Sequence, residues 1–458
     1  MKFSELNIKK DLLENLNSLG YENLTAIQEK SLKHSLNGSD LVGKAKTGSG
    51  KTLSFCLPIV EKLDIKKFRV QALILAPTRE LANQIAIEQR RVFRHIHNIK
   101  VLTLGGGVPF KPQVASLSHQ AHIIVGTVGR VLKHLQEGHL NLENLHTFVL
   151  DEADKMLDMG FYDDILKIIE YLPKTRQTML FSATYEDNIK NLSKELLNNP
   201  IFVEVENEEK AKINQIFYEV DENSEKEEKL DLIEKLIKKY KAQSTIIFCN
   251  QKITCDELND SLYNRYIDSL VMHSDLEQKD RDETLAIFSN KSYPILIASD
   301  VASRGIDIDD IDLVINYEVA LNEKIHTHRI GRTARAGKGG NAITFYTKNE
   351  EERVENIKNN FSDIVFDDKN SIEFDEKYEI DSPYRTIFIN GGKKQKLRKA
   401  DILGSLTAGL GLSKDEIGKI DSFDFCSYVA ICKEKIEYVI NNLPKSKIKG
   451  KYYRIFEK

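Results

Sequence analysis

The sequence predicts two consecutive α/β domains with parallel sheets, followed by a small α+β domain. Short apolar runs alternate with longer amphipathic stretches from about residue 20 to residue 205, and the alternation begins again at residue 213. This pattern is typical of βαβ units, whose parallel sheet is covered by helices on both faces. Residues 384–458 instead read strand, helix, strand, strand, helix, strand, which is the split βαβ order.

The first domain is expected at residues 1–205, with buried parallel strands at its apolar runs. These runs are Ala72–Ala76, Val101–Leu104, Ile123–Val125, Phe148–Leu150 and Met179–Phe181. Polar loop residues follow each run, and a helical pattern usually comes next.

The second domain is expected at residues 213–362, after the polar and charged stretch 204–212. Its strands are predicted at Thr245–Cys249, Ile295–Ala298, Leu313–Ile315 and Ala342–Phe345. One helix face is predicted from apolar side chains at helical spacing, namely Leu230, Ile233, Leu236, Ile237 and Tyr240.

The third domain is expected at residues 384–458, behind an acidic stretch, residues 363–383, that we interpret as a linker. Residues 363–382 hold eight acidic and two basic side chains, and Ser382-Pro383 ends the stretch. The elements expected after it are Thr386–Ile389, Lys399–Leu410, Ile417–Asp421, Tyr428–Ile431, Lys433–Asn442 and Tyr452–Phe456.

Charge is distributed unevenly along the chain. The whole sequence carries 66 basic and 70 acidic residues, a net charge of −4, which by itself does not indicate a nucleic-acid-binding protein. Residues 384–458, however, carry 16 basic against 8 acidic residues. A small basic module therefore follows a large acidic body, and this module is the part suited to bind phosphates.

The composition also predicts the compartment. The five cysteines lack CxxC spacing, so we expect reduced thiols in a cytosolic protein, with zinc binding or a disulfide framework as the alternatives. The first five residues do not resemble a signal peptide, and no apolar run approaches the ~18 residues of a membrane span. A cytoplasmic protein with no membrane partner is expected.

The strongest local motif is a phosphate-binding loop. Residues 45–52 fit the P-loop pattern GxxxxGK[ST], except that Ala45 stands at the first glycine, and they lie between a short apolar run and a helical pattern. Glycines let backbone N–H groups converge on phosphate oxygens, where the helix N-terminus also favours negative charge. The residues expected to bind ATP here are Ala45, Lys46, Thr47, Gly48, Ser49, Gly50, Lys51 and Thr52. A loop for a simpler anion, or a dead site, is the alternative.

Within this loop Lys51 is expected to pair with the β- and γ-phosphates and Thr52 with Mg²⁺. The acidic residues 151–154 follow the apolar run Phe148–Leu150. A carboxylate at this strand end can hold Mg²⁺, so we assign Asp151 to the metal, through a water molecule, and Glu152 to the attacking water. The acidic start of an ordinary helix is the alternative interpretation.

Phosphoryl transfer also needs positive charge on the transferred group. Residues 328–337 supply three arginines in a glycine-punctuated stretch of the second domain. Arginines delivered across a cleft would make hydrolysis depend on domain closure, whereas a charged surface is the alternative.

Taken together, these segments resemble the DEAD-box family of ATP-dependent RNA helicases, and residues 151–154 spell the tetrapeptide that names it. The resemblance covers residues 3 to about 360. It implies two tandem RecA-like parallel-sheet domains, ATP and Mg²⁺ as cofactors, RNA as the partner and a monomeric enzyme. The catalytic residues that it implies are Lys51, Asp151, Glu152, Arg332 and Arg335.

Further segments resemble the family's other nucleotide and coupling motifs. Residues 20–28 are similar to the Q motif, in which Gln28 would contact adenine and Phe3 is the upstream aromatic residue; Leu24 and Ala26 stand where proline is usual. Gly305 and Asp307 are also implied in ATP binding. The residues implied in coupling hydrolysis to unwinding are Asp154, Ser182, Thr184 and His328.

The family's RNA-contacting motifs have counterparts in both α/β domains. They correspond to residues 77–82, 105–106, 127–130, 246–250 and 299–307, with Val128 in place of proline and Ser299 in place of threonine. The RNA-binding residues that the resemblance implies are Pro77, Thr78, Arg79, Gly105, Gly106, Thr127, Arg130, Ser299 and Asp300. Contacts to phosphates and 2′-hydroxyls carry little sequence information but distinguish RNA from DNA.

RNA selection is therefore expected from the basic module. Cations cluster at residues 393–399 and 445–451, and both clusters can engage phosphates, with a merely solubilising surface as the alternative. The candidate RNA-binding residues are Lys393, Lys394, Lys396, Arg398, Lys447, Lys449 and Lys451.

The strand order of the module is that of RNA-recognition (RRM) modules, so the fold is expected to be RRM-like. Phe388 falls in an RNP2-like strand, but the RNP1 pattern is degraded and only Tyr428 keeps an aromatic side chain there. We interpret these aromatic residues as core, and expect RNA to bind loops and basic edges instead of the sheet face.

The tail resembles the DbpA-type RNA-binding domain of bacterial DEAD-box proteins. The matching segments are 389–394, 397–398, 401–404, 417–420 and 447–451. The resemblance implies a hairpin of 23S ribosomal RNA as substrate during assembly of the large ribosomal subunit. A general RNA chaperone or mRNA-decay helicase, and an ATP-gated RNA clamp without turnover, are the alternatives.

Overall fold

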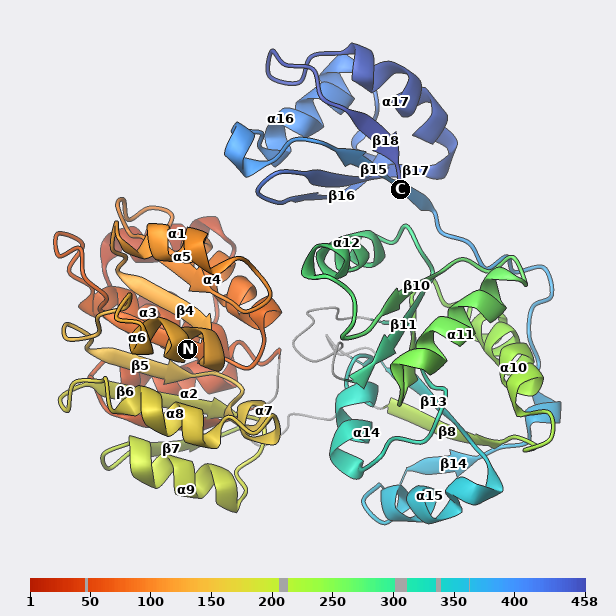
Figure 1. Cartoon of the computed structure of the whole chain (residues 1–458), viewed down its shortest axis with the longest axis horizontal. Coiled ribbons are helices and arrows are strands. Elements are labelled where there is room, and N and C mark those ends of the chain that lie inside the picture. The colour runs from red at the N-terminus through yellow and green to blue at the C-terminus, as the bar shows by residue number, and fades with distance from the viewer. Residues whose placement is uncertain (46–47, 206–212, 301–310, 335–338, 362) are drawn as a thin grey trace. The chain divides into compact units, whose positions relative to one another are not determined.

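The computed structural model describes residues 1–45, 48–205, 213–300, 311–334, 339–361 and 363–458. Two seven-stranded parallel sheets and one four-stranded antiparallel sheet follow one another along the chain (Figure 1), which confirms the predicted fold class. The chain forms two compact units: one contains the first sheet, and the other contains the remaining two. The expected boundary at 206–212 lies outside the described residues.

The first sheet has the strand order β3-β4-β2-β5-β6-β1-β7, with every pair parallel. Its strands are β1 Leu41–Lys44, β2 Ala72–Ala76, β3 Val101–Leu104, β4 Ile123–Thr127, β5 Thr147–Leu150, β6 Gln177–Ser182 and β7 Ile201–Glu204. Its helices are α1 Lys10–Ser18, α2 Ala26–Ser35, α3 Lys51–Lys62, α4 Arg79–Val92, α5 Phe110–Leu117, α6 Val128–Gln136, α7 Ala153–Asp158, α8 Tyr162–Ile169 and α9 Asp187–Leu196.

Helices cover both faces of this sheet, which explains its nearly continuous apolar strands. Successive side chains of a strand point to opposite faces. Along β2, Ile74 packs in the core made with helices α1 to α4, whereas Leu73 and Leu75 pack in the core made with helices α6 to α9.

The second sheet has the order β10-β11-β9-β12-β13-β8-β14 and is also parallel. Its strands are β8 Ile213–Glu219, β9 Thr245–Cys249, β10 Ser269–Met272, β11 Ile295–Ser299, β12 Leu313–Asn316, β13 Gly340–Tyr346 and β14 Ile364–Phe366. Its helices are α10 Glu225–Tyr240, α11 Lys252–Tyr263, α12 Gln278–Ser289, α14 Glu323–Ile330 and α15 Glu351–Lys358.

The acidic stretch 363–383 packs on this second domain. Its strand β14 pairs with β8, and the side chain of Ile372 is buried in the domain core. The Tyr378 hydroxyl donates to the carbonyl of Ala242 (3.2 Å). Apolar and aromatic side chains interrupt the acidic ones, so this stretch, interpreted as a linker from its charge, is attached along much of its length.

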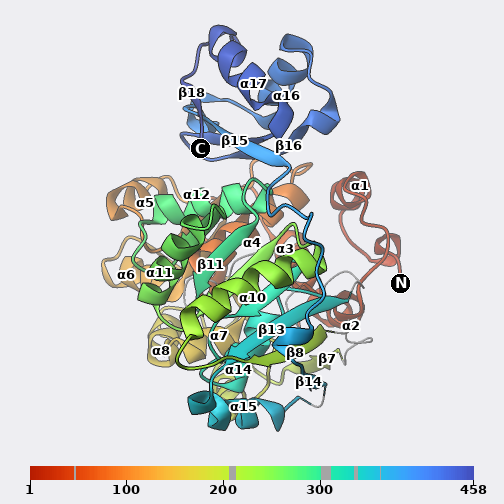
Figure 2. The ribbon, with the colours of Figure 1, turned by 90° about the vertical axis from the view of Figure 1, so that its right-hand side faces the viewer.

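The third sheet is antiparallel, in the order β16-β17-β15-β18. Its strands are β15 Tyr384–Ile389, β16 Ile417–Ser422, β17 Ser427–Cys432 and β18 Ile455–Glu457, and its helices are α16 Lys399–Gly404 and α17 Ile436–Asn442. Both helices lie on the same face of the sheet (Figure 2). The last strand begins later than expected, at Ile455 instead of Tyr452, and the Tyr453 ring just before it packs against the backbone of Gly391.

The backbone at Gly392 lies too close to a neighbouring loop for any larger residue. A Cβ atom at Gly392 would lie 2.3 Å from the carbonyl oxygen of Phe423 and 2.8 Å from the amide nitrogen of Cys426. We expect Gly392→Ala to lower the free energy of unfolding of the module by about 1–3 kcal/mol. The new methyl group would clash with backbone atoms of Phe423 and Cys426, which cannot move aside as a flexible side chain can. Urea denaturation measures this, with Gly404→Ala as control, since nothing lies within 4 Å of a Cβ there. Equal stability of the two variants would contradict the prediction.

Candidate nucleotide and RNA sites

The P-loop lies between the carboxyl end of β1 and the start of α3. Gly50 has a φ of 88°, a left-handed conformation that favours glycine, and Nε2 of Gln28 lies close to it, 2.6 Å from where a Cβ would stand. Nε2 of Gln28 donates to the carbonyl of Gly50 (3.0 Å), and the Thr25 hydroxyl donates to the carbonyl of Ser49 (2.8 Å). The Q-motif residues Thr25 and Gln28 therefore hydrogen-bond to the backbone of the loop, and Gln28 is also the candidate for adenine contact.

Lys51 is buried at the first position of α3, and its Nζ donates to the carbonyl of Ala45 (2.8 Å). The helix N-terminus and this ammonium group together present positive charge at the loop, as phosphate binding requires. Phe3 is also buried; its ring packs beside Tyr21 in the apolar core and anchors the N-terminal segment there. Two further predicted ATP-binding residues, Lys46 and Thr47, lie outside the described part of the chain.

The acidic tetrapeptide, residues 151–154, directly follows β5. It therefore leaves the sheet at the same edge as the P-loop, which follows β1. Glu152 adopts a left-handed backbone (φ 56°), and its Oε2 pairs with Nζ of Lys155 at 2.8 Å, with both side chains buried. Oδ2 of Asp154 accepts from the backbone N–H groups of Ala183 (3.2 Å) and Thr184 (3.3 Å). This carboxylate physically connects the tetrapeptide to the predicted coupling motif.

Burial raises the pKa of Asp151 to about 6, and the charge of Glu152 adds to the rise, while Lys51 opposes it. Oδ1 of Asp151 has no hydrogen-bond partner among the described residues. A buried carboxylate with a spare oxygen, next to a hydroxyl-bearing P-loop, has the chemistry that Mg²⁺ prefers.

The RNA motifs of the first domain form a second cluster. A Cβ at Gly105 would lie 2.7 Å from Cγ of Arg79, so this glycine lets the arginine side chain lie against the loop. Both terminal nitrogens of Arg130 donate to the carbonyl of Val108 (3.1 Å), and one of them also to Oε1 of Gln113 (3.0 Å). Burial and the charge of Arg79 lower the pKa of Arg130. Two neighbouring guanidinium groups that repel one another form a site suited to an anion.

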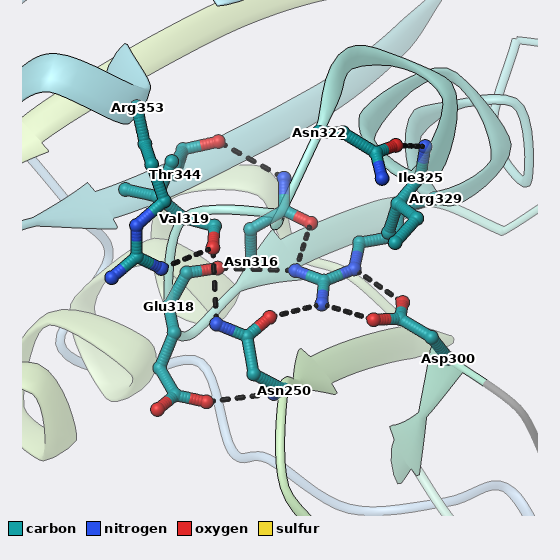
Figure 3. Close-up of polar contacts among 10 residues, drawn as sticks. All are labelled: Asn250, Asp300, Asn316, Glu318, Val319, Asn322, Ile325, Arg329, Thr344 and Arg353. Carbon is teal, nitrogen blue, oxygen red and sulfur yellow. Dashed lines mark hydrogen bonds and ion pairs between the residues drawn. The ribbon is translucent and has the colours of Figure 1, made fainter. Parts of the chain in front are cut away.

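In the second domain, Arg329 holds together the ends of three strands (Figure 3). Its side chain is 1% exposed and forms a bidentate ion pair with Asp300, with both N–O distances at 2.6–2.7 Å. It also donates to Oδ1 of Asn250 (2.7 Å) and to the carbonyl of Glu318 (3.1 Å). These partners follow β9, β11 and β12, so one guanidinium group connects the predicted RNA motifs to α14.

The same helix α14 carries His328, which is half-buried, and leads into Arg332, whose backbone N–H donates to the carbonyl of Arg329 (3.2 Å). Arg332 is itself largely buried. The second predicted finger, Arg335, lies outside the described residues, as do Gly305 and Asp307. Their roles stay predictions.

Sequence reasoning missed Arg329 and Lys155 as functional residues. Arg329 lies within the arginine stretch that we selected, but nothing in its local sequence shows that its partners come from three different strands. Lys155 stands three residues after Glu152, a spacing that brings side chains together on a helix, and this signal could have identified it.

The two basic clusters of the C-terminal module lie side by side. Nζ of Lys449 donates to the carbonyl of Lys396 (2.8 Å) and pairs with Asp401 (3.0 Å). The exposed cations of the two segments therefore form one surface, which we call the basic edge: Lys393, Lys394, Lys396, Arg398, Lys399, Lys445, Lys447, Lys449 and Lys451. The exposed ring of Tyr452 lies under Nζ of Lys447, 5.5 Å from its centroid.

Comparison with known proteins agrees with this architecture. Residues 25–192 match the DEAD/DEAH box helicase family, residues 228–337 the helicase conserved C-terminal domain, and residues 386–456 the DbpA RNA-binding domain. The ATP-dependent RNA helicase DbpA of Escherichia coli is 42% identical over 455 residues, covering 99% of this chain and 98% of that protein. This chain belongs to the DbpA-type DEAD-box RNA helicases.

The ATP-dependent RNA helicase DbpA of Bacillus subtilis is 36% identical over 474 residues, and this alignment covers 99% of this chain and 98% of that protein. Among solved structures, S. cerevisiae Dbp5 bound to RNA and ADP BeF3 aligns with a TM-score of 0.72 at 28% identity, over 81% of this chain and 96% of that one. The resemblance inferred from the motifs is thus confirmed. The helicase binds ATP and RNA and couples ATP hydrolysis to RNA unwinding.

No helix in the described part of the chain is long and apolar enough to cross a membrane. All five cysteines are unpaired in the structure. The described residues contain no group of three or more His, Cys, Asp or Glu side chains that could hold a metal ion.

The environment of Asp151 predicts a conflict between stability and activity. The raised pKa means that ionisation of this buried carboxyl is unfavourable, so its contribution to the free energy of unfolding increases as the pH falls from about 7 to about 4. We expect Asp151→Asn to raise the melting temperature in Mg²⁺-free buffer at pH 7, because the uncharged amide removes this penalty, and to abolish ATP hydrolysis. Calorimetry and an ATPase assay measure the two effects. A lower melting temperature at pH 7 would contradict the argument.

The Arg329 network predicts a specific loss in a conservative variant. Arg329→Lys keeps the charge but cannot reproduce a planar bidentate pair plus two further hydrogen bonds. We expect a loss of about 2–3 kcal/mol in unfolding free energy and at least a tenfold lower RNA-stimulated ATPase rate. The control is Arg353→Lys, because Arg353 is only partly buried and its contacts within the described residues, to the carbonyl of Val319 and to Glu350, are long, at 3.5 Å. Equal behaviour of the two variants would show that the network positions nothing.

Proposed function

We propose that this helicase holds a structured RNA on its basic edge while the two α/β domains open a short duplex nearby. The observation that carries the proposal is the contact of Lys449 with Lys396, which merges two cationic segments into one surface. Because the remainder of the chain carries a net negative charge, phosphates will favour this surface over the rest of the molecule. Tethering then raises the local concentration of duplex at the helicase domains.

For the chemical step, we infer that Lys51 and the P-loop amides bind the phosphates of ATP. Thr52 and Asp151, the latter through water, are the residues that would hold Mg²⁺. When bound, the ion neutralises charge on the β- and γ-phosphates. Glu152 orients the attacking water, and Lys155 fixes the position of its carboxylate. Arg332 and Arg335 supply positive charge to the transferred phosphoryl group.

The RNA that we propose is a hairpin of 23S ribosomal RNA, bound by a cytoplasmic monomer during assembly of the large ribosomal subunit. The match of residues 386–456 to the DbpA RNA-binding domain supports this assignment, as does identity over nearly the full length of two DbpA proteins. The basic edge and the exposed Tyr452 ring suit a folded RNA with accessible phosphates and unstacked bases.

The proposal predicts RNA-specific stimulation of ATPase activity that depends on the basic edge. At one fixed salt concentration, a 23S hairpin fragment should stimulate hydrolysis far more than an unrelated hairpin of equal length. The double variant Lys394→Glu/Lys451→Glu should raise the RNA concentration for half-maximal stimulation about tenfold or more, with little change in the rate at saturation. The control is Lys414→Glu, because Lys414 is an exposed lysine of the same module that lies outside the basic edge.

Equal stimulation by both hairpins would contradict the ribosomal assignment and favour a general RNA-remodelling role. If the double variant behaves like Lys414→Glu, the basic edge is not part of the RNA site. ATP binding without turnover, with any RNA, would favour an RNA clamp.

A further inference from the structure

Gln113 lies between two of the predicted RNA-contacting segments of the first domain. Gly105 follows β3, and Arg130 lies in α6, which follows β4; these two strands are paired neighbours. Their carboxyl ends therefore meet at one edge of the sheet. Helix α5, which connects the two strands, places Gln113 beside both segments, with only 8% of its surface exposed.

The side-chain amide of Gln113 hydrogen-bonds at both of its ends. Its Nε2 donates to the carbonyl oxygen of Gly105 (3.0 Å), and its Oε1 accepts from a terminal nitrogen of Arg130 (3.0 Å). Because a guanidinium group only donates and a carbonyl oxygen only accepts, these two partners fix the orientation of the amide. One neutral side chain thus joins the paired-glycine loop to Arg130.

A third partner, His134, holds the same amide without adding charge. Nε2 of this fully buried imidazole lies 3.0 Å from Oε1 of Gln113 and therefore carries the ring proton, while Nδ1 has no partner among the described residues. Burial and the charge of Arg130 lower the pKa of His134 to about 4. The Phe110 ring stacks on the imidazole, with 4.1 Å between the centroids. His134 is therefore a neutral, fixed donor near pH 7.

The guanidinium group of Arg130 is held by neutral acceptors. Within the described part of the chain its hydrogen bonds go to the carbonyl of Val108 and to Oε1 of Gln113, and none goes to a carboxylate. Arg329 of the second domain differs, because Asp300 balances its charge. The positive charge of Arg130 is thus oriented but not cancelled, as binding of a phosphate requires.

We propose that Gln113 is a positioning residue for RNA binding, which joins Arg130 to the paired-glycine loop and orients the guanidinium group while leaving its charge for an RNA phosphate. The inference rests on the proposed function only in taking Gly105 and Arg130 as RNA contacts, and it does not involve the basic edge. The role requires a neutral amide. A carboxylate at this place would also hold the guanidinium group but would cancel its charge.

The test compares two substitutions of Gln113 with the same substitutions of Gln136 in the full-length protein. Gln136 is exposed at the end of α6, two residues after His134, so it provides a control matched in residue type and in charge. Gln113→Met removes all three hydrogen bonds, whereas Gln113→Glu keeps an acceptor for Arg130 and His134. Fluorescence anisotropy with a labelled single-stranded RNA decamer and saturating ADP BeF3 measures RNA affinity over a series of KCl concentrations.

We expect Gln113→Met to weaken decamer binding about fivefold and Gln113→Glu about tenfold or more, while both Gln136 variants stay within about twofold of the wild type. Gln113→Glu should also lower the slope of log affinity against log salt by about 0.7, the value of one phosphate contact on a single strand. A residue that only stabilised the fold would change the melting temperature and leave this slope unchanged.

The affinity for ATP without RNA, measured in the same variants, should stay within about twofold. Three strands separate β4 from β1, which leads to the P-loop, so a local change at Gln113 should not reach the nucleotide site. A parallel loss of ATP affinity in Gln113→Glu would indicate a general structural role and would contradict the proposal.

Affinity and salt slope of Gln113→Glu equal to those of Gln136→Glu would overturn the proposal, even if Gln113→Met fails to fold. Arg130→Ala separates two causes of such a failure. If Arg130→Ala weakens decamer binding, Arg130 contacts RNA without help from Gln113. If Arg130→Ala has no effect either, the predicted RNA role of this cluster fails as well, and the basic edge is unaffected by that result.

Discussion

The parallel pairing of β1 with β6 is the constraint on which the nucleotide site depends. Lys44 pairs with Ser182 in the strand register, and the backbone N–H of Ala45 donates to the carbonyl of Ser182 (3.0 Å). The P-loop and the coupling motif therefore leave the sheet at the same edge, although 130 or so residues separate them. Because carboxyl ends of parallel strands meet at one edge, β5 delivers the acidic tetrapeptide to the same place.

In the first domain, strand pairing brings the motifs together. In the second domain, the side chain of Arg329 holds the predicted motifs together. Arg329 is buried and would be costly without its carboxylate partner, so Asp300, Asn250 and the backbone after β12 must stay close to it. The predicted RNA motifs and the helix that leads to Arg332 are thus joined by one hydrogen-bonded network.

The C-terminal module separates two surfaces that RRM-like folds often combine. Its aromatic face is covered by α12, and its cations gather at the loops before α16 and β18. Apolar burial suits a permanent protein contact, whereas exposed lysines suit a reversible contact with phosphates that varies with salt. The module can therefore be attached to the protein and bind RNA at the same time.

Most of the core strands could be predicted from the sequence, because strands buried on both faces are apolar runs; Ala72–Ala76 and Thr245–Cys249 match their predicted ranges. Strands β7, β8, β10 and β14 were missed. Three of them lie at sheet edges, where one side is more exposed and the apolar signal is weaker, and β8, beside the edge strand β14, mixes buried and exposed side chains instead of forming an apolar run. The acidic charge of residues 363–383 likewise concealed that the stretch packs on the second domain.

The sequence by itself determined the family, the P-loop, the acidic tetrapeptide and the basic character of the tail, since each depends on residue types at short, regular spacings. Only the tertiary structure decided that Arg329 joins three strand ends, that Lys449 merges two basic segments, and that α12 covers Phe388 and Tyr428. The physical reason is the same in each case. Long-range contacts depend on which surfaces folding brings together, and a local pattern of residues does not contain that information.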